Sequence, residues 1–311
     1  MKIIFFGSPA YSCIVIEKLI LLKYELLALV TQNDKKGKRN IISKTPVTLF
    51  GEKNNIKIFN PSNLNDNEFI ESIKNLKPDL ILIYAYGKIL PETIICIPKY
   101  GCLNIHCSLL PKWRGAAPIQ RALLNKDKQT GVTFFKIDNK LDTGKIVSAH
   151  EYSILKSDDS LILQNKLSNL AASKLDNVLH GIKLNQKLVS QNEKNASYAK
   201  KIHKNEAAIS WIDSASDISS KIKAFVGWPV AEAKVLGEKI KIWEATCILD
   251  EHKKKPGQVI NFTNSGLIIA AGTGSVKIIK LQIPGRNIIT ARDLFNSNNN
   301  FTQKIKESII A

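Results

Sequence analysis

The sequence is poor in cysteine, and its cysteines follow no pattern. Five occur in 311 residues, at irregular spacing: Cys13, Cys96, Cys102, Cys107 and Cys247. This spacing matches neither a disulfide framework nor a zinc-binding motif. We therefore expect no metal site, and free thiols of this kind are typical of a reducing cytoplasm, where we expect the protein to reside.

The sequence also lacks a dinucleotide-binding motif and an uninterrupted apolar segment near its start, and each absence excludes a class of function. The first strand, Lys2–Phe6, is followed by Gly7-Ser8-Pro9 and not by the glycine fingerprint of dinucleotide sites, which argues against an oxidoreductase. The first thirty residues are apolar but are interrupted by Ser8-Pro9, Glu17-Lys18 and Glu25. These interruptions argue against a signal peptide or a membrane span, so we expect no membrane partner.

Acidic residues are fewer than basic residues. The chain has 27 Asp and Glu against 45 Lys and Arg, which gives a net charge of +18 and a pI of about 9.6. This balance favours an anionic macromolecular partner, but general lysine richness explains the charge alone equally well. A hydrophobic content of 44% and a length sufficient for two domains indicate a globular protein.

Alternating strand and helix patterns fill residues 1–188. Apolar runs predict strands at 2–6, 26–31, 56–59, 80–84, 131–136 and 145–152, and helical spacing predicts helices at 11–23, 46–54, 65–76 and 160–180. This order is typical of an α/β fold: a Rossmann-like, mostly parallel sheet with helices on both faces. We interpret residues 1–188 as a catalytic domain of this class.

The rest of the chain changes character. Residues 189–205 are polar with few apolar anchors, and we interpret them as a linker. Residues 206–311 begin with a predicted helix at 214–225, followed by short strands separated by glycine turns at 231–235, 239–249, 257–261, 267–271 and 276–282. Five such strands predict a small OB-like β-barrel, a class that often binds nucleic acid.

The stretch Leu103–Gln120 contains the strongest candidate site. It begins as an apolar strand, turns at Trp113-Arg114-Gly115 and resumes as a helix at Pro118. Asn104 and His106 are two residues apart, so on a strand their side chains lie on one side and can converge on a reacting oxygen. Taken alone, this pair is explained as well by a strand end with a satisfied histidine.

The wider sequence resembles a known family. Ser108-Leu109-Leu110-Pro111 and its continuation through Gln120, together with Trp228-Pro229, resemble the formyltetrahydrofolate-dependent formyltransferases, and in particular the branch that acts on initiator methionyl-tRNA. The resemblance implies N-formylation of the methionine on that tRNA, for translation initiation, with 10-formyltetrahydrofolate as donor. It also implies that no metal is needed.

The resemblance assigns roles to individual residues. Asn104, His106 and Asp142 are the expected catalytic residues, although Asp142 and Gly144 by themselves are ordinary turn chemistry. The donor is expected at Ser108, Leu109, Leu110 and Pro111 and at the loop of Tyr86, Gly87 and Ile89. Cys107 alternates away from His106 on the strand, so we expect it to be buried and inert.

A basic run, residues 34–44, is the expected tRNA contact. Alone it is most simply a solvated loop, but the resemblance implies an insertion that reaches the acceptor stem, with Lys38 at the family's arginine position. The expected tRNA-binding residues are Lys35, Lys36, Lys38 and Arg39 and, in the linker, Lys200 and Lys201.

Two other functions remain open from the sequence. A formyltransferase acting on an amino-sugar nucleotide would share the catalytic trio, but would differ after Pro111 and need no basic loop. A non-catalytic RNA-binding protein would explain the charge but gives no reason for Asn104, His106 and Asp142 to occur together. For the formyltransferase that acts on methionyl-tRNA we expect a monomer.

Overall fold

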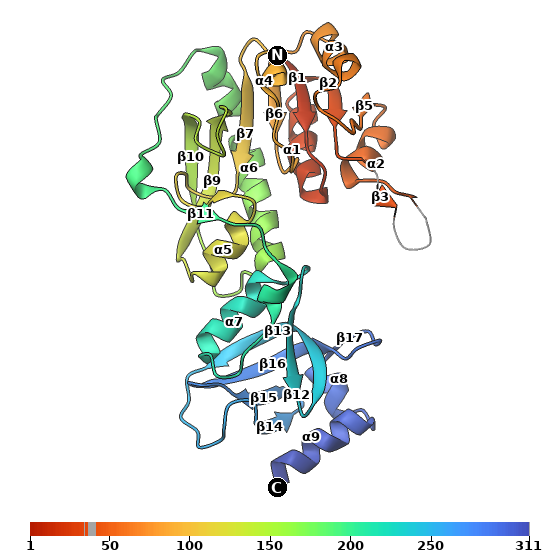
Figure 1. Ribbon diagram of the computed structural model, residues 1–311, viewed down its shortest axis with the longest axis vertical. Helices are drawn as coiled ribbons and strands as arrows, with labels where there is room; N and C mark the ends of the chain where they lie inside the picture. The colour runs from red at the N-terminus through yellow and green to blue at the C-terminus, as the bar shows by residue number, and fades with distance from the viewer. Residues whose placement is uncertain (34, 37–41, 311) are drawn as a thin grey trace. The chain divides into compact units, whose positions relative to one another are not determined.

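The structure is a computed structural model that describes residues 1–33, 35–36 and 42–310 (Figure 1). The chain divides into two compact units. The first comprises Met1–Pro118, Gln129–Ile154 and Gln164–Lys200, and the second comprises Ile119–Lys128, Leu155–Leu163 and Lys201–Ala311. Among the described residues, no helix is long and apolar enough to cross a lipid bilayer.

A seven-stranded sheet with the order β10-β9-β7-β6-β1-β2-β5 forms the centre of the first unit. Its strands are β1 (Lys2–Phe6), β2 (Glu25–Val30), β5 (Ile58–Phe59), β6 (Leu80–Ile83), β7 (Cys102–His106), β9 (Gln129–Lys136) and β10 (Ile146–Ser153). The five strands from β7 to β5 are parallel, whereas β9 and β10 are antiparallel at one edge. The prediction of a mostly parallel sheet is confirmed.

Helices cover both faces of this sheet. They are α1 (Ala10–Leu21), α2 (Pro46–Lys53), α3 (Asn67–Asn75), α4 (Glu92–Ile95) and α6 (Ser160–Lys183), whereas α5 (Pro118–Leu124) belongs from Ile119 onward to the second unit. The apolar faces of α3 and α4 pack in one cluster with alternate strand residues such as Ile81 and Ile83. On the opposite face, the Tyr84 side chain contacts α1 through Tyr11 and α6 through Ser168. Burial on both faces explains why the strands are continuous apolar runs.

The polar segment after α6 is attached to the first unit. Val189 exchanges two backbone hydrogen bonds with Ile146 of β10, and β11 (Tyr198–Ala199) pairs in parallel with β8 (Arg114–Gly115). Figure 1 shows this segment passing beside β10 before it reaches β11. We call residues 189–199 the strap. This part of the predicted linker is therefore hydrogen-bonded to the elements that surround Asn104 and His106.

The second unit is built on an antiparallel sheet with the order β12-β13-β16-β15-β14, and β17 pairs with β16. Its elements are α7 (Ala215–Ala224), β12 (Ala231–Val235), β13 (Glu238–Ile248), β14 (Val259–Thr263), β15 (Gly266–Ala270), β16 (Ser275–Gln282), β17 (Ile288–Thr290), α8 (Ala291–Phe295) and α9 (Asn300–Ile310). The predicted small antiparallel β-domain is confirmed. Helix α9 was not predicted; its Phe301 and Ile305 are part of the buried core.

Candidate active site

Asn104 and His106 lie on β7, between parallel β6 and antiparallel β9. Alternation along the strand places both side chains on one side, as the sequence predicted. The carboxyl end of β7 is the edge at which open α/β sheets bind their ligands. His106 is 6% exposed, whereas Asn104 is half-buried and its side chain makes no hydrogen bond to any other described residue. Asn104 therefore has an amide available to a ligand.

His106 is engaged through both ring nitrogens. Its Nε2 lies 2.8 Å from the carbonyl oxygen of Trp113, and because a carbonyl only accepts, Nε2 carries the hydrogen. Its Nδ1 lies 3.6 Å from Oδ2 of Asp142. The ring orientation is thus fixed from both sides. Donation by Nε2 to a ligand oxygen requires that the bond to Trp113 be exchanged for a bond to the ligand, because catalytic hydrogen bonds often form fully only with substrate present.

Asp142 reaches His106 from the loop between β9 and β10. Its backbone is left-handed, with φ of 54°, which is uncommon outside glycine. Its Oδ2 accepts a 2.8 Å hydrogen bond from the backbone N–H of Gly115. Of the three predicted catalytic residues, the structure therefore brings His106 and Asp142 together directly and places Asn104 on the same side of β7.

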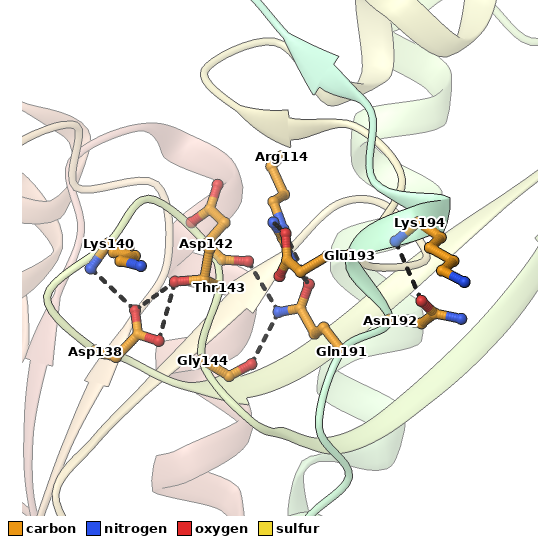
Figure 2. A network of polar contacts seen from close by, with 10 residues as sticks. All are labelled: Arg114, Asp138, Lys140, Asp142, Thr143, Gly144, Gln191, Asn192, Glu193 and Lys194. Atoms are coloured by element: carbon orange, nitrogen blue, oxygen red, sulfur yellow. Dashed lines mark hydrogen bonds and ion pairs between the residues drawn. The ribbon is translucent and has the colours of Figure 1, made fainter.

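A buried arginine of β8 is hydrogen-bonded to the strap, and the strap in turn is hydrogen-bonded to this loop (Figure 2). The Arg114 side chain is fully buried, and its guanidinium donates to Oε1 of Gln191 and, through two bonds of 2.8 and 2.7 Å, to Glu193. Sequence reasoning missed Gln191 and Glu193, because a polar segment without apolar anchors has the composition of a linker. No sequence signal marked these two residues, because the burial of Arg114, which makes its guanidinium need partners, is visible only in the fold.

Arg114 and Glu193 each stabilise the charged form of the other. The hydrogen bonds from Arg114 lower the pKa of the Glu193 carboxyl, and those bonds raise the pKa of the Arg114 guanidinium in turn. Both groups are therefore charged at neutral pH. A two-bond guanidinium–carboxylate contact fixes orientation as well as distance, so the strap holds the Arg114–Gly115 turn in a defined position.

The Ser108–Pro111 run is held by the sheet. Thr133 of β9 donates to the carbonyl oxygen of Ser108 at 2.6 Å and accepts from the N–H of Leu110 at 3.1 Å. The Ser108 hydroxyl donates to the carbonyl oxygen of Lys112 at 2.5 Å and is 1% exposed as a residue. The serine is thus used to close the turn, and the Leu110–Pro111 peptide bond is cis.

The other predicted donor-binding loop follows β6. Gly87 has a left-handed backbone with φ of 78°, and the carbonyl oxygen of Tyr86 accepts from the Gln32 side chain at 2.6 Å. Tyr86 is 1% exposed, and its hydroxyl makes no hydrogen bond within the described part of the chain. Burial raises its pKa to about 12, so the hydroxyl remains a donor. Ile89, in contrast, is 87% exposed.

The predicted tRNA-binding residues are only partly described. Lys35 and Lys36 form β3, which pairs with β4 (Ile42–Ser43) as an antiparallel hairpin. Lys38 and Arg39 lie outside the described residues. Lys200 and Lys201, which directly follow the strap, are exposed.

Cys107 is buried at 7% exposure, as expected, and contacts the Tyr84 hydroxyl. Burial raises its pKa to about 11, so at pH 8 roughly one thiol in a thousand is ionised. We expect a neutral alkylating reagent at pH 8 to modify exposed Cys96 and leave Cys107 unmodified, as read by peptide mass spectrometry. Rapid modification of Cys107 in the folded protein would contradict this assignment.

No group of three or more His, Cys, Asp or Glu side chains with metal-binding geometry occurs among the residues that the structure describes.

Two family models match the chain. The model described as formyl transferase matches residues 1–179, and the model described as formyl transferase, C-terminal domain, matches residues 201–299. Similar curated proteins include the methionyl-tRNA formyltransferases of Methylococcus capsulatus (36% identical, covering 96% of this chain and 97% of the relative) and Acetivibrio thermocellus (38% identical, 94% and 95%).

Solved structures with low sequence identity share the fold. A sugar 3N-formyl transferase, WlaRD, solved in the presence of dTDP and 5-N-formyl-tetrahydrofolate, is 21% identical with a TM-score of 0.67, covering 92% of this chain and 99% of its own. HypX from Aquifex aeolicus in complex with tetrahydrofolic acid is 17% identical with a TM-score of 0.68, covering 95% of this chain and 47% of its own.

Proposed function

Since the chain belongs to the formyl transferase family, we propose that it is an enzyme that transfers a formyl group to the amino group of methionine on initiator methionyl-tRNA, for translation initiation. The observation that carries this proposal is 36% identity to a methionyl-tRNA formyltransferase over nearly the whole of both chains. The donor proposed is 10-formyltetrahydrofolate.

The two alternatives have less support. Sugar formyltransferases resemble this chain at 21% identity, a level at which only the fold is shared. A purely RNA-binding role leaves the contact between His106 and Asp142, beside the unengaged amide of Asn104, without a purpose.

The proposed chemistry uses the trio directly. Attack of the methionine amine on the formyl carbon forms a tetrahedral intermediate with negative charge on oxygen. The Asn104 amide donates to that oxygen, and His106 donates to it when its Nε2–H leaves the carbonyl of Trp113. Asp142, whose Oδ2 lies 3.6 Å from Nδ1 of His106, keeps the ring oriented and accepts, through water, the proton that the amine releases. The C–N bond to the folate then breaks, and the proton passes to the folate nitrogen.

The folate donor is proposed to bind between the Ser108–Pro111 run and the loop of Tyr86, Gly87 and Ile89. One observation supports this location: Ile89 offers an exposed apolar side chain. Because the Ser108 hydroxyl and the Tyr86 carbonyl are already bonded within the protein, recognition by this region uses mainly other backbone groups and apolar contacts.

We also propose a function for each part of the chain. Residues 1–188 form the catalytic domain, 189–205 the linker, and 206–311 an OB-like domain that binds tRNA. Phosphates of the acceptor stem are bound by Lys35, Lys36, Lys38 and Arg39 and, near the second domain, by Lys200 and Lys201. We propose that the enzyme acts as a monomer in the cytoplasm.

The test is a comparison of acceptors. The protein is incubated with 10-formyltetrahydrofolate and, separately, with charged initiator tRNA, the same tRNA without methionine, and an amino-sugar nucleotide. Formylation of the charged tRNA only is expected. Formylation of the sugar nucleotide with a higher kcat/KM would overturn the proposed acceptor.

A further inference from the structure

Asp142 occupies a backbone conformation that needs outside support. A left-handed residue that is not glycine persists where its surroundings determine it. Within its own loop, Asp138 accepts hydrogen bonds from the N–H of Lys140 and the hydroxyl of Thr143 (Figure 2), but it makes none to Asp142. The loop closes tightly at Gly144, where an added Cβ would collide with the carbonyl of Lys136.

The support comes from the strap, through Gln191. Its Nε2 donates to the carbonyl oxygens of Asp142 and Gly144, each at 2.8 Å, and its Oε1 accepts from Nε and Nη2 of Arg114. The orientation of this amide is unambiguous, because carbonyls lie on one side and guanidinium donors on the other. Both donors and both acceptor positions of the amide are used.

Asp142 is therefore held at two points. Its main chain is held by Gln191, and its Oδ2 is held by the N–H of Gly115, the residue that follows Arg114 on β8. Because Arg114 also orients Gln191, the two supports are parts of one assembly, and that assembly faces the 3.6 Å contact with His106.

We propose that Gln191 is a positioning residue for formyl transfer, whose side-chain amide clamps the Asp142–Gly144 turn and keeps the Asp142 carboxylate at His106. The proposal rests on the proposed function for its kinetic part. A displacement of about 1 Å at a reacting group can cost on the order of 10²-fold in rate, so a residue that never touches substrate can control kcat.

The test substitution is Gln191→Glu. It keeps an oxygen for Arg114 and nearly the same shape, but it removes both donors to the loop. The matched control is Gln186→Glu, because Gln186 also donates its amide to a backbone carbonyl of the first unit, that of Val147 at 2.9 Å, away from the Asp142 turn. We expect Gln191→Glu to lower kcat by about 10- to 100-fold with KM values for donor and tRNA within about twofold, and the control to retain kcat.

A second readout is independent of activity. Amide hydrogen exchange at Gly115 reports whether Asp142 Oδ2 still accepts its hydrogen bond. Exchange there should accelerate at least about tenfold in Gln191→Glu and stay unchanged in Gln186→Glu. If the wild-type protein formylated no acceptor, the proposed function would be wrong. Amide exchange at Gly115 would still show whether Gln191 holds the Asp142 turn, because this measurement does not depend on activity. Wild-type exchange at Gly115, or wild-type kcat, in Gln191→Glu would overturn the positioning role.

A double-mutant cycle separates positioning from general support of the fold. If Gln191 acts through Asp142, Gln191→Glu should cost less than about threefold in kcat when Asp142→Asn is already present. If Gln191→Glu lowered kcat by the same factor with and without Asp142→Asn, the proposal would be overturned. If Gln191→Glu does not fold, Gln191→Met replaces it, because it also lacks the donors but adds no charge. The same results are expected for its kcat, for amide exchange at Gly115 and for the double-mutant cycle with Asp142→Asn.

Discussion

His106→Ala is expected to lower the single-turnover rate of formyl transfer by about 10²- to 10⁴-fold. The substitution removes the ring that lies 3.6 Å from Asp142 and 2.8 Å from the Trp113 carbonyl. The rate is measured with enzyme in excess over charged tRNA, so that the chemical step is observed directly. Affinity for tRNA, measured separately, should change less than about twofold, because His106 is only 6% exposed and phosphates are bound by exposed side chains.

The control for this experiment is His150→Ala. His150 is on β10 of the same sheet, packs edge-on against Phe134 and has no contact with Asp142, so its loss should leave the single-turnover rate unchanged. Asn104→Ala and Asp142→Asn should each reduce the rate by orders of magnitude as well, and combinations of them should be non-additive. A near-normal rate in His106→Ala would refute its assigned role.

Replacing Lys36, Lys38 and Arg39 together by alanine is the second change with a large expected effect. If each neutralises one phosphate, the slope of log affinity for tRNA against log salt should fall by about three, and KM for tRNA should rise by about 10- to 100-fold at low salt. Binding of the folate donor should be unchanged. The measurement is tRNA affinity at three or more salt concentrations.

The chain offers a matched triple control at the amino ends of the strands, which is the end of the sheet opposite the candidate site. Lys2, Lys57 and Lys99 are exposed and stand at or just before the amino ends of β1, β5 and β7, whereas the candidate site is at the carboxyl end of β7. Their replacement removes the same charge. An equal loss of tRNA affinity in both triples would show that overall charge, and not the basic run, governs binding.

Much of the fold could be predicted because it depends on local pattern. Continuous apolar runs such as Lys2–Phe6 predicted buried strands, and their observed bounds agree closely with those predicted. Asn104 and His106 could be placed on one side of β7 from strand alternation alone. Helix α9 was missed because its sequence is mostly polar, and only its packing identifies Phe301 and Ile305 as core residues.

The rest of the candidate site depends on contacts between distant segments. The bond from His106 to the carbonyl of Trp113 uses the backbone, which no side-chain pattern predicts. Gln191 lies 49 residues from Asp142, in a segment held by hydrogen bonds and not by apolar burial, so hydrophobic periodicity gave no indication of it. The resemblance supplied Asp142 itself, but the residues that hold it in place are visible only in the fold.

The most direct test of the central claim follows a labelled formyl group from 10-formyltetrahydrofolate in the presence of charged initiator tRNA. The wild-type protein should transfer the label to the methionine amino group, with one label per tRNA and loss of transfer in Asp142→Asn. Binding of both substrates without transfer of the label, or equal transfer by wild type and Asp142→Asn, would contradict the account.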